Sequence, residues 1–224
     1  NAGGLLYSVS SLAKSVQSSG NDVQAIGLSD QYIEEDNHIW GDITTQTFPV
    51  IPPKQLGYSP SLKKHLIDSD IEILHNNGLW MYPSAATYRW SKKTDKPYLI
   101  TPHGMLDRWA LYNSRLKKKL AKYLFEDKHL RNASCIHALN ESEAQSIRDY
   151  GLNNPVCVIP NGVNIAETDV QIAAPWSDRF LGESKILLYL GRLHPKKGLP
   201  ELLKAWSANN ESGWKLVVAG WEEN

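Results

Sequence analysis

The sequence has 224 residues, of which 42% are hydrophobic and 21% charged, a composition that excludes disordered and collagen-like chains. Lysine plus arginine and aspartate plus glutamate number 24 each. No overall field therefore attracts nucleic acid, and any anion site must come from local placement of side chains.

The predicted elements of the first part alternate between helices and strands. Apolar residues recur at helical spacing over residues 5–19, after Gly3 and Gly4, and Gly20 ends that pattern. Strands are expected at 22–28, 71–75, 97–101 and 134–139, a short strand and turn at 155–163, and helices at 60–69, 113–132 and 141–151. This alternation predicts a mostly parallel sheet with helices on both faces.

A polar stretch without periodicity, residues 164–184, predicts a linker between a domain at 1–163 and a second at 185–224. The second domain offers a strand at 185–191, a helix at 199–206 and a strand at 214–220. Two strands and one helix cannot bury a doubly wound core. We therefore expect the sequence to be an excerpt that lacks a leading strand and most of its second domain.

Candidate anion ligands lie at two helix starts. Gly3 and Gly4 open the first helix, whose N–H groups can approach a phosphate, and a simple tight turn is the alternative. Arg192 follows a strand and Lys197 begins a helix, so we expect both at the carboxyl edge of the second sheet, where ligands of open α/β folds bind. Charge-assisted hydrogen bonds, at about 1.5–3 kcal/mol each, exceed the helix dipole at about 0.3–1 kcal/mol.

Polar side chains follow two predicted strand ends of the first domain. His103 comes after strand 97–101, where an imidazole can bind a sugar hydroxyl or phosphate or transfer a proton; a structural role is the alternative. His75, Asn77 and Trp80 follow strand 71–75 and combine polar groups with an aromatic face, as sugar sites do. A packed loop anchored by Trp80 is the alternative there.

No metal site is expected, because the seven histidines show no ligand spacing and the Asp-Ser-Asp at 68–70 precedes a strand, on the amino edge of the sheet. Cys135 and Cys157 lie in strand-like runs without metal spacing. We expect buried, reduced thiols, which are typical of a cytoplasmic protein.

The helix at 113–132 carries an apolar stripe surrounded by cations. The stripe is Leu116, Leu120, Tyr123 and Leu124, and the cations are Arg115, Lys117, Lys118, Lys119 and Lys122. Two interpretations stay open. Residues 115–122 contact an anionic membrane surface peripherally, or the stripe packs on the core and the basic face is solvated.

Four stretches carry a family resemblance: AGGLLYSVSSLAKSVQSSGNDVQ, TPHGMLDRWAL, ALNESEAQSIRDYGL followed by VIPNGVN, and LYLGRLHPKKGLPELLKAW. Together they resemble the family 4 glycosyltransferases, retaining enzymes of GT-B type in polysaccharide and glycolipid assembly. The resemblance implies an α/β fold with two Rossmann-like domains across a cleft. The first, 1–163, would bind the acceptor, and the second, incomplete from 185 on, would bind a nucleotide-sugar donor.

The resemblance also implies residue roles. Gly3 and Gly4 match the loop that approaches the donor diphosphate, Arg192 and Lys197 the basic pair that neutralises it, and His103 the residue facing the donor sugar. Fixed cations beside a leaving diphosphate stabilise the transition state more than the ground state. No metal and no cofactor is therefore expected.

The expected function is transfer of a hexose, with retention, from a UDP-sugar such as UDP-glucose to a saccharide or lipid-linked saccharide, at the cytoplasmic face of the membrane. The family's acidic pair of the second domain would lie beyond Asn224, so residues 1–224 alone are expected to be inactive. A GT-B-type nucleotide-sugar epimerase and a non-catalytic nucleotide-sugar-binding module are the alternatives.

Overall fold

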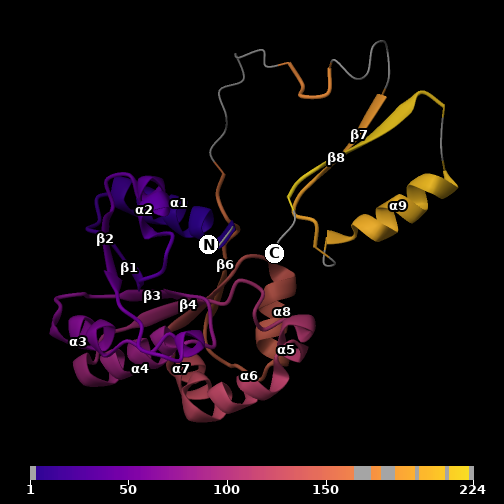
Figure 1. Cartoon of the computed structure of the whole chain (residues 1–224). Coiled ribbons are helices and arrows are strands. Elements are labelled where there is room, and N and C mark those ends of the chain that lie inside the picture. The colour runs from indigo at the N-terminus through magenta and orange to yellow at the C-terminus, as the bar shows by residue number, and fades with distance from the viewer. Residues whose placement is uncertain (1–3, 164–172, 178–184, 195–196, 210–211, 222–224) are drawn as a thin grey trace. The chain divides into compact units, whose positions relative to one another are not determined.

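The computed structural model describes residues 4–163, 173–177, 185–194, 197–209 and 212–221. The chain divides into two compact units, Asn1–Asn164 and Ile165–Asn224 (Figure 1). Every strand pair among these described ranges is parallel, and helices alternate with the strands. The predicted α/β class is confirmed. Gly3 lies outside the described residues, and so does the predicted linker, residues 164–184, apart from 173–177.

The first unit begins with a helix and a pair of parallel strands. The elements are α1 (Gly4–Ser18), β1 (Gln24–Leu28), α2 (Ile33–Asp36), the 3-10 helix η1 (Asn37–Trp40) and β2 (Thr44–Phe48). Gly20 follows α1 at a φ of 89°, a left-handed conformation that glycine adopts without steric cost. β1 and β2 pair from Gln24 with Thr44 to Leu28 with Phe48.

The main sheet of this unit has four parallel strands in chain order. They are β3 (Leu74–Asn77), β4 (Tyr98–Thr101), β5 (Cys135–Ala138) and β6 (Val156–Val158). Asn77 pairs with Thr101 and Ala138 with Val158, each at the carboxyl end of its strand. The loops that follow β3, β4 and β5 therefore leave the sheet at one edge.

Helices connect these strands. They are the 3-10 helix η2 (Lys54–Leu56), α3 (Pro60–Asp68), α4 (Tyr82–Thr94), α5 (Arg108–Tyr112), α6 (Arg115–Ala121), the π-helical turn η3 (Lys122–Glu126), α7 (Asp127–Asn132) and α8 (Glu141–Asp149). Figure 1 shows α3, α4 and α7 together on one side of the sheet. Ser59 caps α3 by accepting from the Leu62 N–H, and Asn140 caps α8 by accepting from the Glu143 N–H.

One hydrophobic core joins sheet and helices of the first unit. Trp90 of α4, Tyr98 and Ile100 of β4 and Ile136 of β5 are fully buried in it. Ile26, Leu28 and Phe48 of β1 and β2 pack against the same cluster. The two sheets are thus parts of one folded body.

The second unit contains β7 (Lys185–Leu190), α9 (Leu199–Ala208) and β8 (Trp214–Ala219) among its described residues. Its two strands pair in parallel from Lys185 with Trp214 to Leu190 with Ala219. A Cβ on Gly220 would lie 1.8 Å from the Gly191 carbonyl oxygen, so only glycine fits where β8 ends. The expected order of strand, helix and strand is confirmed here.

One predicted strand is misplaced. Residues 71–75 were the expected strand, whereas β3 spans Leu74–Asn77. Asn77 therefore lies within the strand instead of after it, and His75 lies near the start of the strand instead of at its end. The polar side chains are tolerated there because they bond internally: Asn76 donates to the Gly78 carbonyl at 2.8 Å and accepts from Thr87 at 3.3 Å.

The predicted helix at 113–132 begins at Arg115 in the structure, and its apolar stripe is not packed. Leu116, Leu120, Tyr123 and Leu124 are all exposed, while Ala121 is buried and Phe125 packs against the core. Positions 121 and 125 lie one residue on, about 100° around the helix from 120 and 124. The interpretation in which this stripe packs on the core is wrong for the part of the chain that the structure describes.

The two thiols are free and half-buried, less buried than expected, with their sulfur atoms 3.7 Å apart on β5 and β6. Across the described ranges, no helix is long and apolar enough to span a bilayer.

Candidate functional site

The turn after β4 has an unusual backbone. His103 and Gly104 follow β4 at φ values of 52° and 72°, both left-handed. Glycine adopts this conformation freely, but for histidine it is uncommon and costs energy unless neighbouring groups hold it. The turn therefore needs partners that fix it.

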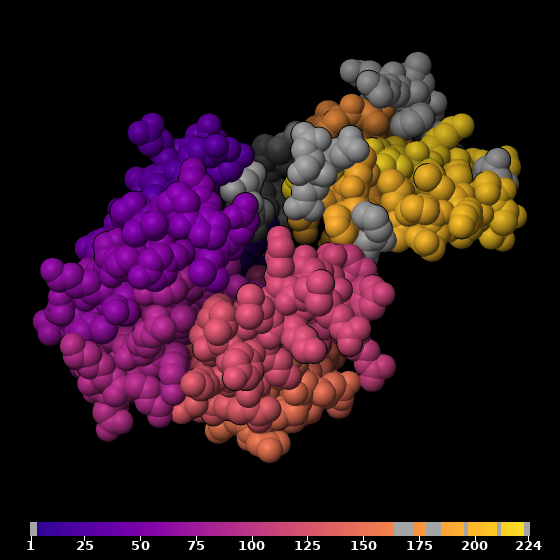
Figure 2. Space-filling view, turned by 60° about the horizontal axis from the view of Figure 1, so that its bottom comes forward, coloured from indigo at the N-terminus to yellow at the C-terminus, as the bar shows by residue number. Residues whose placement is uncertain are grey.

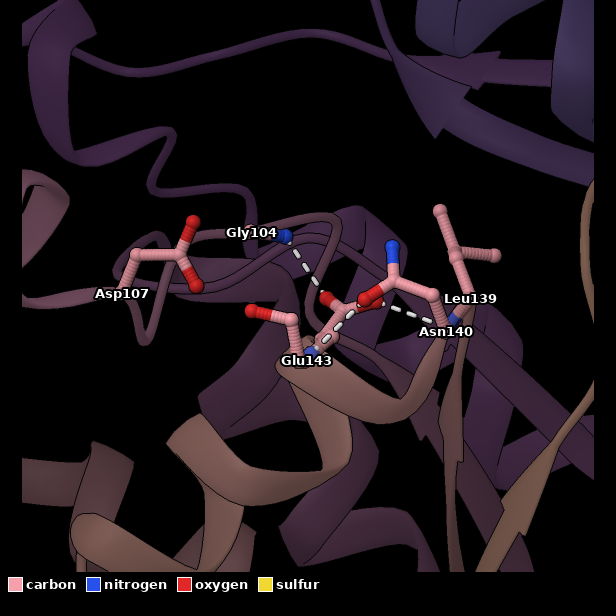
Figure 3. Close-up of a pocket in the computed structure, with 6 residues that line it drawn as sticks. Gly104, Asp107, Leu139, Asn140 and Glu143 are labelled. Carbon is pink, nitrogen blue, oxygen red and sulfur yellow. Dashed lines mark hydrogen bonds between the residues drawn. The ribbon is translucent and has the colours of Figure 1, made fainter.

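Glu143 of α8 holds this turn. Its buried carboxylate accepts from the Gly104 N–H at 2.6 Å through one oxygen and from the Leu139 N–H at 2.7 Å through the other (Figure 3). Asn140 in turn accepts from the Glu143 N–H at 2.9 Å, which begins α8. Because charge-assisted hydrogen bonds are short and strong, Glu143 fixes the loops after β4 and β5 to each other.

Asn77 holds the His103 ring from β3. Its amide nitrogen donates to the His75 carbonyl at 3.2 Å, which leaves its oxygen, 2.9 Å from His103 Nε2, as the acceptor. His103 Nε2 therefore carries the hydrogen, and Nδ1 is the nitrogen that accepts. Burial, and secondarily the nearby His137 and His75, lower the pKa of His103 to about 4. The ring is neutral at pH 7 and cannot serve as a cation for a diphosphate.

A second chain of hydrogen bonds runs behind this ring. His137 Nε2 lies 2.7 Å from the Ile159 carbonyl, so it donates, and its Nδ1 accepts from the Thr101 hydroxyl at 3.0 Å. Thr101 in turn accepts from His75 Nε2 at 2.6 Å. Burial, and then His137, lower the pKa of His75 to about 4. The proton on His75 Nε2 is thus engaged inside the protein.

Trp80 is held on several sides. Its backbone has a φ of 74°, and its backbone N–H donates to the buried Glu126 carboxylate at 2.6 Å. Lys118 lies 5.8 Å from its ring centroid and the Tyr150 ring 6.5 Å away. These contacts favour the packed-loop interpretation of Trp80. The acceptor-binding role of His75, Asn77 and Trp80 stays a prediction.

A pocket of about 200 Å³ adjoins the His103 turn. It is lined by Gly104, Asp107, Leu139, Asn140, Ser142 and Glu143. In Figure 3 the Asp107 carboxylate and the Asn140 amide lie on opposite sides of it. Ligand sites commonly measure roughly 300–1,000 Å³, so this pocket alone is too small for a whole nucleotide sugar.

The glycine predicted at the diphosphate is accessible. Gly4 is the first residue of α1, and a Cβ added there would meet nothing within 4 Å. Open space beside a helix N-terminus is what close approach of a phosphate requires. Gly3 lies outside the described residues.

Arg192 and Lys197 share one hydrogen-bonded turn of the second unit. Arg192 follows β7, and its carbonyl accepts from the Tyr189 hydroxyl at 3.1 Å and the His194 N–H at 2.9 Å. The Lys197 N–H donates to the His194 carbonyl at 2.8 Å, and its side chain is exposed just before α9. Both cations thus lie at the carboxyl edge of β7, as expected of an anion site in such folds.

Sequence reasoning missed Glu143, Asp107, Thr101 and His137. For Glu143 a signal existed, since Asn140 and Glu143 form the Asn-X-X-Glu pattern of a helix start. Its carboxylate departs from that pattern by bonding Gly104, 39 residues away, which local sequence does not reveal. Among the described side chains, no group of three or more His, Cys, Asp or Glu could hold a metal ion.

Comparison with known proteins adds a family and a fold. The sequence model of Glycosyltransferase Family 4 matches residues 2–167. No curated protein matches. Among solved structures, the chain is similar to two crystal structures of Anabaena Alr3699/HepE. One is HepE in complex with UDP-glucose (17% identity, TM-score 0.66), and the other is HepE in complex with UDP and glucose (16% identity, TM-score 0.67).

The match to HepE covers nearly all of this chain but only part of HepE. It spans 99% of this chain and 58% of the other in the UDP-glucose complex, and 100% and 59% in the complex with UDP and glucose. At such low identity the likeness establishes the fold alone, and the α/β architecture of GT-B type predicted from the sequence is confirmed.

Proposed function

The chain belongs to Glycosyltransferase Family 4, and from this premise we propose that it transfers a hexose from a UDP-sugar to a saccharide or lipid-linked saccharide. UDP-glucose or a similar UDP-hexose is the proposed donor, because HepE, which shares the fold, was crystallised with UDP and with UDP-glucose. The observation that carries the proposal is the His103 turn. Asn77 fixes a neutral imidazole there, and Glu143 fixes the backbone of the turn beside a pocket of about 200 Å³.

We assign the donor diphosphate to Gly3, Gly4, Arg192 and Lys197. As the bond from the sugar to the diphosphate breaks, negative charge grows on the leaving oxygen. A guanidinium and an ammonium placed there stabilise that charge more than the ground state. On this basis the proposed reaction needs neither a metal nor a cofactor.

His103 is assigned a hydrogen bond to the donor sugar. A base with a pKa of about 4 is too weak to take a hydroxyl proton efficiently near pH 7. We propose that the acceptor oxygen forms its bond to the anomeric carbon on the face from which the diphosphate leaves, and that the diphosphate takes the acceptor proton. Same-face attack retains the anomeric configuration.

The contacts of His75 and Asn77 suggest a revised role for them. Both are engaged inside the protein, His75 with Thr101 and Asn77 with His103. We therefore propose that they orient the His103 turn. Cytoplasmic location is part of the same proposal, supported by the two free thiols, which are typical of a reducing compartment. Peripheral contact with a membrane through residues 115–122 is also proposed, supported by the basic residues of that segment and the exposed Leu116 and Leu120 among them.

The test is UDP release by the full-length protein supplied with UDP-glucose, with a lipid-linked saccharide, and with both. The proposal expects release only with both. An epimerase would change the sugar of the donor without any acceptor, and a non-catalytic binding module would release no UDP.

The cation assignment is tested with Arg192→Ala and Lys197→Ala. Each is expected to lower the transfer rate by roughly 100- to 1,000-fold, the usual effect of removing one group that stabilises transition-state charge. Lys204→Ala, an exposed lysine on α9, is the matched control and should keep its rate. An unchanged rate in either variant would remove that residue from the diphosphate site.

A further inference from the structure

The segment from α5 to η3 exposes an unusual set of large apolar side chains. Their exposed fractions run from 50% for Trp109 to 85% for Tyr123. The set comprises Trp109, Tyr112, Leu116, Leu120, Tyr123 and Leu124. Exposed apolar residues scattered singly need no explanation, but a group within sixteen consecutive positions, 109–124, marks a binding surface.

The charge of the same segment is one-sided. Residues 108–125 contain six lysines and arginines and no acid, in a chain whose charges balance at 24 each. Arg115, Lys117 and Lys119 are exposed, while Lys118 and Lys122 lie over the rings of Trp80 and Tyr150. Of the acids beside the segment, Asp107 lines the pocket, Asp149 lies 3.7 Å from Arg108, Glu126 is buried and Asp127 pairs with Arg131. The surface therefore selects an anionic partner.

Its composition separates the possible anionic partners. Leucines exposed between lysines have no use in binding a nucleic acid backbone, which is recognised by cations and polar groups. Protein interfaces are depleted in lysine. Leucine, tyrosine and tryptophan flanked by lysine and arginine are instead typical of helices that lie in the interface of an anionic bilayer.

We propose that the surface formed by α5, α6 and η3, residues 108–126, docks on an anionic lipid bilayer. Leu116, Leu120, Tyr123 and Leu124 enter the headgroup region, and Arg115, Lys117 and Lys119 bind lipid phosphates. The pink segment that contains these helices lies on the face of the first unit turned to the viewer in Figure 2. The surface is distinct from the pocket beside Gly104.

Docking would bring the site to lipid-linked substrates. α5 begins at Arg108, five residues after His103, and Asp107 between them lines the pocket. Bilayer contact through α5 would therefore hold the His103 turn close to the headgroup layer. Only this consequence rests on the proposed transfer to a lipid-linked acceptor, because lipid binding is measured without any reaction.

The experiment is co-sedimentation of the full-length protein with vesicles of phosphatidylcholine alone and of phosphatidylcholine mixed with phosphatidylglycerol. Binding is expected only to the mixed vesicles and should weaken as salt is raised. Leu116→Ser/Tyr123→Ser is expected to abolish it. The matched control, Ile51→Ser/Ile73→Ser, removes two exposed apolar residues elsewhere on the first unit and should bind as the parent does.

A charge variant gives an independent arm. Arg115→Glu/Lys117→Glu/Lys119→Glu should weaken binding at least roughly 100-fold, because each lost cation contributes about a factor of five at such a surface. Lys54→Glu/Lys64→Glu/Lys93→Glu carries the same charge change at exposed sites elsewhere and should bind within a few-fold of the parent. Circular dichroism confirms that each variant is folded.

Three results would overturn the proposal: equal binding to both kinds of vesicle, unchanged binding by the stripe variant, or no vesicle binding together with self-association that the stripe variant abolishes. UDP binding is measured in parallel. If the parent protein binds UDP but neither kind of vesicle, this surface is refuted and the proposed function still stands. If the parent protein binds the mixed vesicles but not UDP, the surface stands and the proposed function is refuted.

Discussion

Two histidines at the carboxyl edge of the main sheet are held neutral by their surroundings. His75 and His103 are both withdrawn from water, and His137 is close to each. A buried imidazole resists protonation because the charged form loses its hydration, and another histidine nearby adds to that effect. These imidazoles are therefore uncharged near pH 7, and the proposed neutralisation of a diphosphate falls to Arg192 and Lys197.

This neutrality predicts an acid-sensitive fold. The pKa values of His75 and His103 are about 4 when folded, against about 6.5 when unfolded. Between these values the unfolded chain binds more protons, so the free energy of unfolding is highest above pH 6.5 and falls as pH drops toward 4. The fall is up to about 1.4 kcal/mol per pH unit for His75 and smaller for His103, which is more exposed to solvent. Urea unfolding at several pH values measures this slope.

His75→Gln is the variant that tests the assignment. It keeps a side-chain donor for Thr101 but cannot be protonated, so its slope between pH 4 and 6.5 should be shallower than that of the parent. His38→Gln, at an exposed histidine in η1, is the control and should keep the parent slope. If the free energy of unfolding of His75→Gln fell with pH as steeply as that of the parent, His75 would not be a source of acid sensitivity.

The carboxylate of Glu143 positions the His103 turn. In Glu143→Gln one acceptor oxygen becomes an amide that faces a backbone N–H, which should cost about 1–3 kcal/mol of stability. We expect a lower kcat with a smaller change in donor KM, and a shift of the His103 ring resonances in NMR spectra. Glu141→Gln, exposed on the same helix, should change none of these. Unshifted His103 resonances in Glu143→Gln would contradict the positioning role.

At the scale of elements, strongly periodic segments were predictable and polar or small-residue ones were not. α1, α8, β4 and β7 follow the apolar patterns that predict them. β2, with the sequence TTQTF, and α4, whose first turn is YPSA, lack such patterns. Burial of α4 comes from Ala85, Ala86 and Trp90 packing in the core, which depends on contacts far along the chain.

The candidate site likewise has features that were predictable from the sequence and features that were not. The positions of His103, Arg192 and Lys197 at carboxyl ends of strands could be predicted from strand order alone. The bonds from Asn77 to His103 and from Glu143 to Gly104 join residues 26 and 39 positions apart. They depend on which strands are neighbours and in what register, which a single sequence does not specify.

The close approach of β7 and β8 gives an element-scale prediction. Gly220→Ala would place a methyl group against the Gly191 backbone, and relief requires the strand ends to separate. We expect a loss of about 1–3 kcal/mol, as for overpacked cores, and weaker hydrogen-exchange protection of the Gly191 amide, which donates to Ala219 at 3.0 Å. Gly27→Ala in β1, where a Cβ meets nothing within 4 Å, is the control. Unchanged protection at Gly191 would refute the close approach.

At the scale of the whole molecule, the net charge is zero, but the cations with proposed roles fall into two separate groups. The cations proposed for the diphosphate belong to the second unit, and the cations proposed for the lipid surface to the first. The His103 turn contributes hydrogen bonds without charge. This distribution is consistent with the proposal that a charged donor and a membrane bind at different surfaces. Because the net charge is zero, only the local cations attract each of these anionic partners.

The most direct measurement of the central claim is the rate of hexose transfer from UDP-glucose by the full-length protein with His103→Ala, beside His65→Ala as a control in α3. We expect a transfer rate at least about 100-fold lower for His103→Ala, with UDP affinity unchanged because the neutral imidazole does not bind the diphosphate. The control should retain its rate once corrected for folded protein. Full transfer activity in His103→Ala would contradict the account and return this histidine to a structural role.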